Sequence, residues 1–256
     1  MSLQIPDDLI TTLAAAERVV VLTGAGISAE SGVPTFREAQ TGLWAQYDPR
    51  ELATPQAFAR NPRLVWEWYD WRRKLIQQAK PNLAHHALVD LEQALPTFLL
   101  VTQNIDGFHW LAGSRDMIEL HGNIARTRCY EEGHVVSWWE ETDELPPRCP
   151  HCGGPLRPDV VWFGEGISEQ ALRSAFDAAA ACDLFISVGT SAMVQPAAGL
   201  PLLAKRMGAR VLEINPAQTA LSVIADWSLQ DKASNLLPQL VRRLDFPTNA
   251  IDGAEQ

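Results

Sequence analysis

RVVVLTGAGISA, residues 18–29, holds the pattern that decides the fold. A short apolar run leads directly into a glycine-rich turn and then into small residues that suit the start of a helix. Glycines so placed permit a tight turn and close approach of the backbone to a diphosphate, while the following helix N-terminus offers N–H groups. The pattern predicts the first strand-turn-helix unit of a nucleotide-binding α/β domain. By itself it also suits a glycine-rich turn that binds no ligand.

Three further apolar runs have the same form and end at polar residues or glycine: residues 98–102, 184–188 and 210–214. Buried parallel strands have this composition. Helix-like stretches, such as 85–94 and 169–181, lie between the runs, an alternation that predicts an α/β fold with a Rossmann-like, doubly wound parallel sheet. We expect the sheet domain to comprise residues 1–39, 83–128 and 159–245, the smaller lobe to comprise a helical insertion (40–82) and a zinc-ribbon-like insertion (129–158), and 246–256 to form a flexible tail.

Composition limits the classes of function. The 256 residues are 46% hydrophobic and 20% charged, ordinary globular values, with a net charge of −10. That sign disfavours a nucleic acid or an anionic membrane surface as partner. The N-terminal segment has neither a basic signal-peptide region nor an apolar stretch long enough to span a bilayer, so we expect a cytoplasmic protein. The four cysteines suit a metal site or core thiols better than a disulfide framework.

Polar clusters follow the predicted strands: TQNIDG (102–107), ELHGN (119–123), GTS (189–191) and INP (214–216). Since parallel strands end at one edge of a sheet, these clusters are expected to meet there and face a ligand. Gln103 and Asn104 suit bonding to a ribose or an amide. Asp106 also suits a simpler role, capping the next helix. His121 is a candidate general base, although a lone histidine is more often structural.

The segment WEWYDWRR, residues 66–73, places a cation among apolar neighbours. On a helix, the residues three and four positions from Arg72 are aromatic or aliphatic, whereas Asp70 faces Arg73 and Lys74. One interpretation is an arginine whose stem covers apolar surface while its head reaches water. The other is a binding site for an anionic group.

The motifs GAGISAESGVPTFR, TQNIDG, HGN, VVWFGE, GTS and the late KAS occur in order from about residue 19 to 240. Together they resemble the sirtuin family, most closely its bacterial CobB-type members. The resemblance implies an NAD-dependent protein-lysine deacylase, which consumes NAD and yields nicotinamide, O-acyl-ADP-ribose and the free lysine. It implies that His121 is the general base, that Asn104 is also catalytic, and that the following residues bind NAD: Gly24, Ala25, Gly26, Ser28, Ala29, Glu30, Phe36, Arg37, Gln103, Asn104, Ile105, Asp106, Gly189, Thr190, Ser191, Asn215, Pro216, Ala217 and Ala233.

The same resemblance assigns the substrate site. Tyr69 and Arg72 match the YxxR pair of the branch that removes dicarboxylic acyl groups, so succinyl and malonyl groups are expected, with acetyl as a further substrate. The acyl-lysine protein is expected to bind as an extended peptide alongside a strand formed by Val161, Trp162, Phe163, Gly164 and Glu165.

The small lobe departs from the family pattern. Two CxxC pairs usually hold a structural zinc, but here the first reads CYEE, leaving Cys129, Cys149 and Cys152. Glu132 is a candidate for the fourth ligand, as are His134 and His151. Alternatively, the lobe has lost the metal and is held by packing around its tryptophans.

Two other functions stay open at this point. The same activated ribose suits ADP-ribosyl transfer to a protein side chain, which would leave the Tyr69–Arg72 pair without a role. A noncatalytic sensor of NAD or ADP-ribose would need neither His121 nor Asn104.

Overall fold

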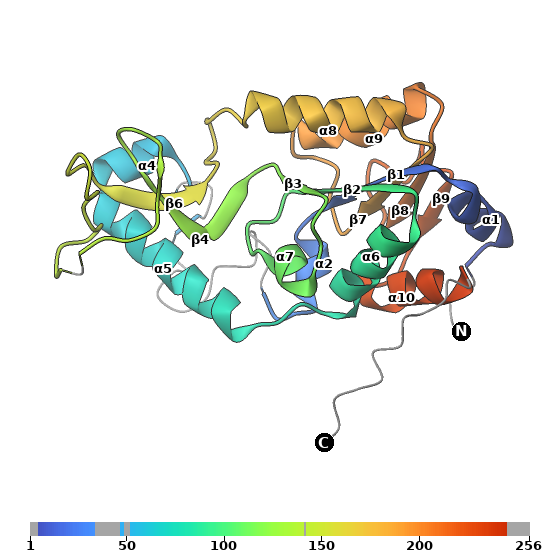
Figure 1. Ribbon diagram of the computed structural model, residues 1–256, viewed down its shortest axis with the longest axis horizontal. Coiled ribbons are helices and arrows are strands. Elements are labelled where there is room, and N and C mark those ends of the chain that lie inside the picture. The colour runs from blue at the N-terminus through green and yellow to red at the C-terminus, as the bar shows by residue number, and fades with distance from the viewer. Residues whose placement is uncertain (1–4, 34–46, 49–51, 141, 245–256) are drawn as a thin grey trace, which may run out of the picture.

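A computed structural model describes residues 5–33, 47–48, 52–140 and 142–244. Its larger part is a six-stranded, fully parallel sheet in the order β3-β2-β1-β7-β8-β9 (Figure 1). The strands are β1 (Arg18–Thr23), β2 (Thr97–Thr102), β3 (Met117–Glu119), β7 (Leu184–Val188), β8 (Arg210–Ile214) and β9 (Trp227–Leu229). All four apolar runs of the sequence lie in this sheet, which confirms the predicted doubly wound α/β fold.

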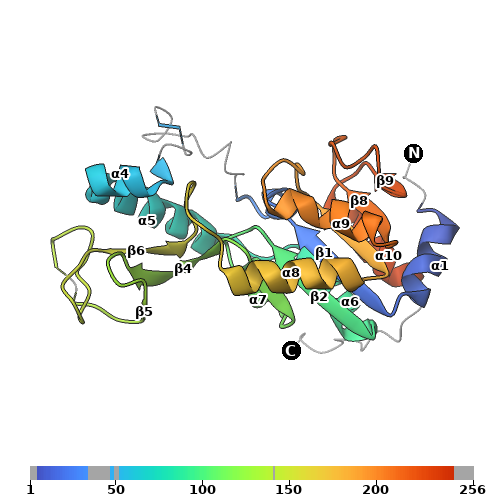
Figure 2. The ribbon, with the colours of Figure 1, turned by 90° about the horizontal axis from the view of Figure 1, so that it is seen from above.

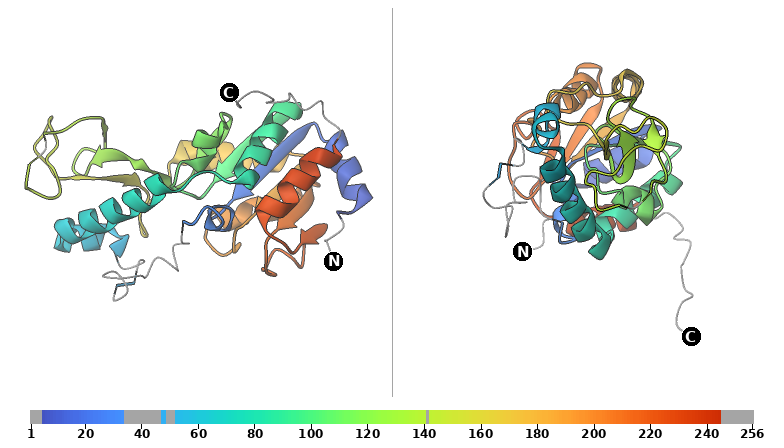
Figure 3. Two further views of the ribbon diagram at one scale, coloured as in Figure 1. Left: turned by 90° about the horizontal axis from the view of Figure 1, so that it is seen from below. Right: turned by 90° about the vertical axis from the view of Figure 1, so that its left-hand side faces the viewer.

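Helices cover both faces of the sheet and bury its aliphatic side chains. One face packs against α1 (Asp7–Ala15), α6 (Leu83–Ala94) and α10 (Ala233–Arg243), the last two of which cross that face in Figure 3, left. The other packs against α8 (Glu169–Ala181) and α9 (Leu200–Arg206), in front in Figure 2. Fully buried leucines such as Leu13, Leu88 and Leu237 each contribute roughly 1.5–3 kcal/mol relative to exposed ones.

The strand order fixes where a ligand is expected. From β1 the chain adds β2 and β3 on one side, and β7, β8 and β9 extend the sheet on the other. A crevice forms outside the carboxyl ends of parallel strands where the direction of winding reverses. In this sheet that place is the end of β1 and β7, where the GAGISA and GTS segments begin. Two short elements flank it, α2 (Gly26–Ala29) and α7 (Phe108–Ala112), and η2 (Ala197–Gly199) follows the GTS turn.

The smaller lobe lies at one end of an elongated molecule (Figure 1). It contains α4 (Pro55–Arg60), α5 (Pro62–Gln78) and an antiparallel sheet in the order β5-β4-β6, formed by β4 (Gly122–Cys129), β5 (Val135–Val136) and β6 (Leu156–Val160). This sheet extends beyond both ends of the expected 129–158 insertion. A proline in the first turn and the Asn61 side chain, which accepts from the Leu64 N–H, define the start of α5.

An apolar cluster joins the two parts of the molecule. It includes Tyr69 of α5, Phe108 of α7, Ile124 of β4 and Trp162, and Ile105 of the TQNIDG segment packs against it. The arrangement places α5 beside the polar edge of the parallel sheet. Among the described residues, no helix has the length and apolar character needed to cross a membrane.

Candidate active site

The polar segments that follow the strands meet at the carboxyl edge, as predicted. Gln103 donates from Nε2 to the Thr190 hydroxyl at 3.2 Å, and Asn215 donates from Nδ2 to the Thr190 carbonyl at 3.4 Å. Asn104, nearly buried, donates from Nδ2 to the carbonyl of Gly24 at 3.0 Å. Residues just after β1, β2, β7 and β8 are therefore joined by hydrogen bonds at one edge of the parallel sheet.

The glycines of the first turn are required by close packing. A Cβ on Gly24 would lie 2.8 Å from the carbonyl oxygen of Gly189, and one on Gly26 would lie 2.7 Å from the same atom. The Gly26 N–H donates to that carbonyl at 2.8 Å. A side chain at either position would force the GAGISA and GTS segments apart. The two glycines are therefore required by the contact between these turns, in addition to any contact with a ligand.

The start of α10 also reaches this turn. Glu30 accepts from the Ser234 N–H at 3.1 Å and lies 3.6 Å from the ammonium of Lys232. The buried Ala233 therefore lies next to the turn formed by residues 24–30. Pro216 and Ala217 are exposed beyond the end of β8, while Phe36 and Arg37, two other expected NAD contacts, lie outside the described residues.

Asp106 has one oxygen for the helix and one for the crevice. Its Oδ1 accepts from the Phe108 N–H at 2.9 Å, which serves the start of α7, and its Oδ2 accepts from the Ser28 hydroxyl at 2.8 Å. Burial raises the pKa of Asp106, while these two hydrogen bonds and the charge of Arg72 oppose the rise. The simpler capping role is therefore present together with a bond into the cofactor turn.

His121 is held in one tautomer. Its Nδ1 lies 2.9 Å from the Gln103 carbonyl oxygen, which can only accept, so Nδ1 carries the proton. The other nitrogen, Nε2, then has a lone pair. Burial lowers the pKa of His121, partly offset by that hydrogen bond, so the ring stays neutral at neutral pH. A neutral imidazole with one basic nitrogen is the form needed for proton abstraction.

Two buried histidines beneath the crevice escaped the sequence analysis. His85 accepts at Nδ1 from the Asn82 N–H at 3.2 Å, so its Nε2 carries hydrogen and faces the Ser28 hydroxyl at 3.5 Å. His109 lies 2.9 Å from the Thr23 hydroxyl through Nε2. Burial lowers the pKa of His85 to about 4 and that of His109 to about 3, and the charge of His86 adds to the first shift and that of His85 to the second. In the sequence both are ordinary helix residues. Only His85 has a signal, because it stands three positions after Asn82, a residue type that caps helices, and nothing marks His109.

Tyr69 and Arg72 lie on the buried face of α5. Their residues are 2% and 7% exposed, and the guanidinium lies 5.1 Å from the centre of the Trp68 ring. Burial lowers the pKa of Arg72, while Tyr69 and Asp106 act in the opposite direction. Burial raises the pKa of Tyr69 to about 12, so the phenol stays protonated. The pair is thus a buried cation and a hydroxyl, electrostatically coupled to the aspartate of the cofactor crevice. Asp70 pairs with Lys74 at 2.7 Å, as expected.

Residues 161–165 form a turn, so the expectation of a strand there is wrong. Gly164 has a φ of +88°, outside the extended region, and the Glu165 N–H donates to the Trp162 carbonyl at 3.0 Å. The N–H groups of Val161 and Phe163 donate to the carbonyls of His121 and Ala53, both at 2.9 Å. The turn therefore places Val161 against the HGN segment, with the Phe163 side chain exposed.

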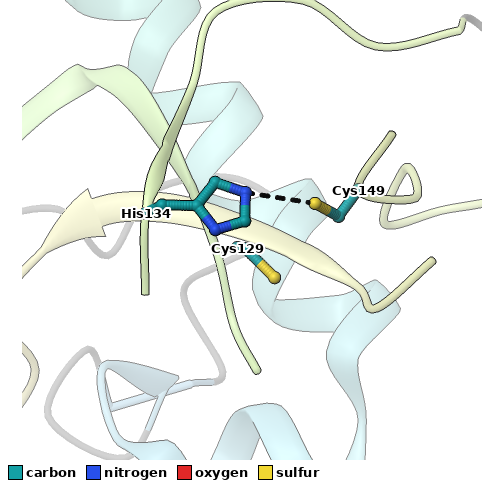
Figure 4. A group of neighbouring side chains, drawn as sticks. All are labelled: Cys129, His134 and Cys149. Atoms are coloured by element: carbon teal, nitrogen blue, oxygen red, sulfur yellow. Dashed lines mark hydrogen bonds between the residues drawn. The ribbon is translucent and has the colours of Figure 1, made fainter. Parts of the chain in front are cut away.

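A cysteine and histidine cluster lies in the small lobe (Figure 4). The ligand atoms of Cys129, His134 and Cys149 lie within 4.8 Å of one another. The sulfur of Cys149 is 3.4 Å from His134 Nε2, and that of Cys152 is 3.4 Å from the sulfur of Cys129. Tetrahedral zinc with bonds of about 2.0–2.3 Å needs ligand separations near these values. A Cys₃His set is therefore consistent with zinc.

Glu132 stands at the sequence position of the second cysteine, but it is His134, two residues later, that lies with Cys129 and Cys149. Glu132, the first candidate, lies 3.4 Å from His134 Nδ1, on the side of the ring away from the Cys149 sulfur. A carboxylate there orients a histidine ligand. The ring of His151 packs edge-on against that of His134 with centroids 5.1 Å apart. Trp139 packs against Trp66 of α5, so aromatic packing adds to the cluster.

The family follows from comparison with known proteins. The Sir2 family model matches residues 24–196, more than half of the chain and all of the crevice segments except INP and the start of α10.

The chain belongs to the Sir2 family.

Among its Sir2 relatives, an NAD-dependent protein deacylase of Aquifex aeolicus is 52% identical over 223 residues, covering 87% of this chain and 93% of the relative. NAD-dependent protein deacylase 1 of Pseudomonas aeruginosa is 49% identical over 247 residues, covering 93% and 98%.

Solved Sir2 structures share the fold. A Sir2 homologue in complex with NAD matches with a TM-score of 0.88 and 46% identity, over 94% of each chain. A mutant homologue in complex with 2'-O-acetyl ADP-ribose matches with a TM-score of 0.87 and 45% identity, over 96% of this chain and 100% of the other. A Sir2 variant with a deacetylated p53 peptide and 3'-O-acetyl ADP-ribose matches with a TM-score of 0.77 and 33% identity, over 93% and 96%.

Proposed function

We propose that this chain is an NAD-dependent protein-lysine deacylase that prefers acyl groups ending in a carboxylate, succinyl and malonyl, and also removes acetyl. The deacylase activity is supported by the Sir2 relatives and by the fold that this chain shares with an NAD-bound Sir2 homologue. The acyl preference rests on one observation: a buried arginine and a buried tyrosine lie beside that crevice on α5.

NAD is assigned to the carboxyl edge of the parallel sheet. The turn at Gly24–Glu30 is proposed to hold the diphosphate, and Gly189–Ser191, Asn215–Ala217 and Ala233 the adenosine end. Gln103–Asp106 would surround the nicotinamide and its ribose. The joined hydrogen bonds of Gln103, Asn104, Thr190 and Asn215 support this, because they preorganise polar groups in a largely buried site. When bound, NAD supplies ADP-ribose as acceptor of the acyl group.

His121 is proposed to remove a proton from a ribose hydroxyl. Its Nδ1–H bond to the Gln103 carbonyl fixes the ring and leaves Nε2 basic. The lowered pKa keeps the base unprotonated at neutral pH. Gln103 thus links the base to the proposed ribose pocket, since its backbone orients His121 and its side chain reaches Thr190.

The acyl oxygen would be the nucleophile toward the ribose carbon, with Asn104 near the reacting groups.

Burial makes the charge of Arg72 effective in recognition. Tyr69 belongs to an apolar cluster, so an acyl chain that reaches α5 meets Tyr69 and Arg72 among apolar side chains. A guanidinium binds a carboxylate through parallel hydrogen bonds, and such charge-assisted bonds are stronger away from water. The phenol, protonated at neutral pH, adds a donor. An acetyl group gains none of these bonds, so the site is expected to favour dicarboxylic groups.

The protein substrate is proposed to bind as an extended peptide near residues 161–165. Most N–H groups of that turn are already bonded within the chain, so its carbonyl groups, which can each accept a further hydrogen bond, and the exposed Phe163 side chain are proposed to contact the peptide. Recognition of this kind uses mainly the peptide backbone, so we expect loose sequence preference.

The test is competition among acyl groups on one peptide. Peptides carrying succinyl-, malonyl- or acetyl-lysine are incubated with and without NAD, and free lysine is measured by mass spectrometry. We expect NAD-dependent removal, with Arg72→Met lowering kcat/KM for succinyl by roughly ten- to a hundredfold, the range for a lost charge-assisted contact, and affecting acetyl far less.

Arg63→Met is the matched control, because Arg63 lies on the same helix with its side chain 66% exposed and pairs with Glu67 at the surface. Equal losses for succinyl and acetyl in Arg72→Met would refute the acyl preference. Absence of NAD-dependent removal of any acyl group would refute the deacylase itself.

A further inference from the structure

The indole of Trp162 makes a buried hydrogen bond to the Tyr69 hydroxyl. Its Nε1 lies 3.0 Å from the phenolic oxygen, and both residues are 2% exposed. An indole nitrogen only donates, so in this contact the Tyr69 oxygen must accept. The direction of the bond is therefore fixed by chemistry.

This direction constrains the phenolic hydrogen. A phenol O–H prefers the plane of its ring, which gives the hydrogen two orientations. Where a donor points at the oxygen from one side, the hydrogen is directed to the other. The Tyr69 hydroxyl, in general both donor and acceptor, then acts as a donor toward whatever else reaches it.

The neighbours of Trp162 hold the indole in place. The guanidinium of Arg157 lies 3.3 Å from the centre of the Trp162 ring, and the ring of Phe58 is 5.3 Å away, centroid to centroid. Arg157 forms two hydrogen bonds with Glu165, at 2.5 and 3.0 Å. Glu165 also accepts from the Trp162 N–H at 2.8 Å. Stacking, the ion pair and the backbone bond together leave the indole little freedom to turn.

We propose that Trp162 is a positioning residue for acyl specificity, which turns the Tyr69 hydroxyl into an obligate donor and so selects acyl chains that end in an acceptor such as a carboxylate. The inference rests on the proposed function of Tyr69 and Arg72 and extends it. Tyr69 contacts the acyl terminus, and Trp162 acts through Tyr69. A chain that ends in a donor is rejected, because both the phenol and the guanidinium would meet a hydrogen.

A double-mutant cycle tests this directly. kcat/KM is measured for succinyl- and acetyl-lysine on one peptide, and the succinyl-to-acetyl ratio is compared in wild type, Trp162→Phe, Tyr69→Phe and the double variant. We expect Trp162→Phe, which keeps an aromatic ring, though a smaller one, and removes the N–H, to lower the ratio roughly tenfold in the wild-type background, as for one hydrogen bond to a charged group. In the Tyr69→Phe background it should change the ratio less than about twofold, because the effect passes through the hydroxyl.

The four variants of the cycle test the acyl preference and the role of Trp162 separately. If the wild-type enzyme shows no preference for succinyl over acetyl, the proposed acyl preference is wrong. If the preference is present but Tyr69→Phe leaves the ratio unchanged, Tyr69 takes no part in it and the role of Trp162 is overturned. If Tyr69→Phe lowers the ratio but Trp162→Phe does not, or lowers it equally in both backgrounds, only the role of Trp162 is overturned.

Two controls guard against a folding effect. Trp138→Phe, at an exposed tryptophan of the small lobe, should leave the ratio as in wild type. Should Trp162→Phe fail to fold, benzothienylalanine at position 162 replaces the N–H by sulfur in a ring of similar shape. The proposal predicts the same fall in the ratio, and an unchanged ratio would overturn it.

Discussion

At the scale of single residues, burial keeps three histidines neutral for different purposes. His85 and His109 lie under the crevice with pKa values near 4 and 3, bonded to Ser28 and Thr23. His121 lies at the crevice, and its Nε2 keeps a lone pair because Nδ1 carries the proton and donates it in a hydrogen bond to the Gln103 carbonyl. Only His121 is therefore placed to act as a base.

His121→Tyr is expected to lower kcat for deacylation by roughly a hundred- to ten-thousandfold, the usual contribution of a general base, while leaving NAD affinity within a few-fold of wild type. Single-turnover mass spectrometry gives the chemical step and calorimetry gives NAD binding. Turnover close to wild type would remove His121 from the mechanism.

A pH profile gives a second readout of the same claim. Since the base must be neutral and burial lowers its pKa, wild-type kcat should persist as pH falls past the ordinary histidine value of about 6.5 and decline only below it. A decline that begins above about pH 7 would contradict a buried, lowered pKa.

At the scale of elements, a turn in the small lobe supplies His134 as a candidate zinc ligand, which the CxxC spacing alone did not single out. His134 lies directly before β5 (Val135–Val136). The Cys129 N–H donates to the His134 carbonyl at 2.9 Å, and this hydrogen bond closes the turn. The turn points the imidazole at Cys149, with Glu132 behind it. The backbone N–H groups of Cys152 and His151 lower the pKa of the Cys149 thiol to about 7, although burial alone would raise it.

His134→Ala is therefore expected to lose most bound zinc, while Glu132→Gln keeps the metal with roughly ten- to a hundredfold weaker affinity, as for an orienting carboxylate. Metal content by mass spectrometry and zinc competition with a chelator measure the two effects. His86→Ala, at an exposed histidine of α6, is the control. Zinc loss from Glu132→Gln with retention in His134→Ala would reverse the assignment.

The four central strands of the parallel sheet could be predicted almost to the residue, because their apolar runs end at polar turns, whereas the two edge strands, β3 and β9, are only three residues long and were not predicted. The helix at 169–181 also begins and ends where expected, with Ser168 capping its start. Residues 161–165 could not be predicted, since the bonds from Val161 to His121 and from Phe163 to Ala53 come from distant segments. For the same reason the buried His109 and the Trp162–Tyr69 bond have no sequence signal.

At the scale of the whole molecule, the neutral histidines tie stability to pH. In the unfolded chain His109 titrates at the ordinary pKa of about 6.5, whereas in the fold its pKa is about 3. Between these values the unfolded state binds more protons, so stability rises with pH and falls as the solution is acidified. By pH 4, His109 alone accounts for a loss of about 3 kcal/mol.

His109→Gln should therefore flatten the acid side of the stability curve, by about 1.4 kcal/mol per pH unit between about pH 6 and 4. Urea unfolding at a series of pH values measures it, with His86→Gln as the exposed control. Parallel curves for wild type and His109→Gln would show that His109 is not buried neutral.

The measurement that tests the account most directly is a balance of products from one succinyl-lysine peptide and NAD. Nicotinamide, free-lysine peptide and the acyl-bearing nucleotide are quantified together by mass spectrometry. A deacylase of the proposed kind gives the three in equal amounts, with the succinyl group on ADP-ribose. Nicotinamide released with the peptide still succinylated, and the mass of ADP-ribose found on peptide or protein, would contradict it and indicate ADP-ribosyl transfer.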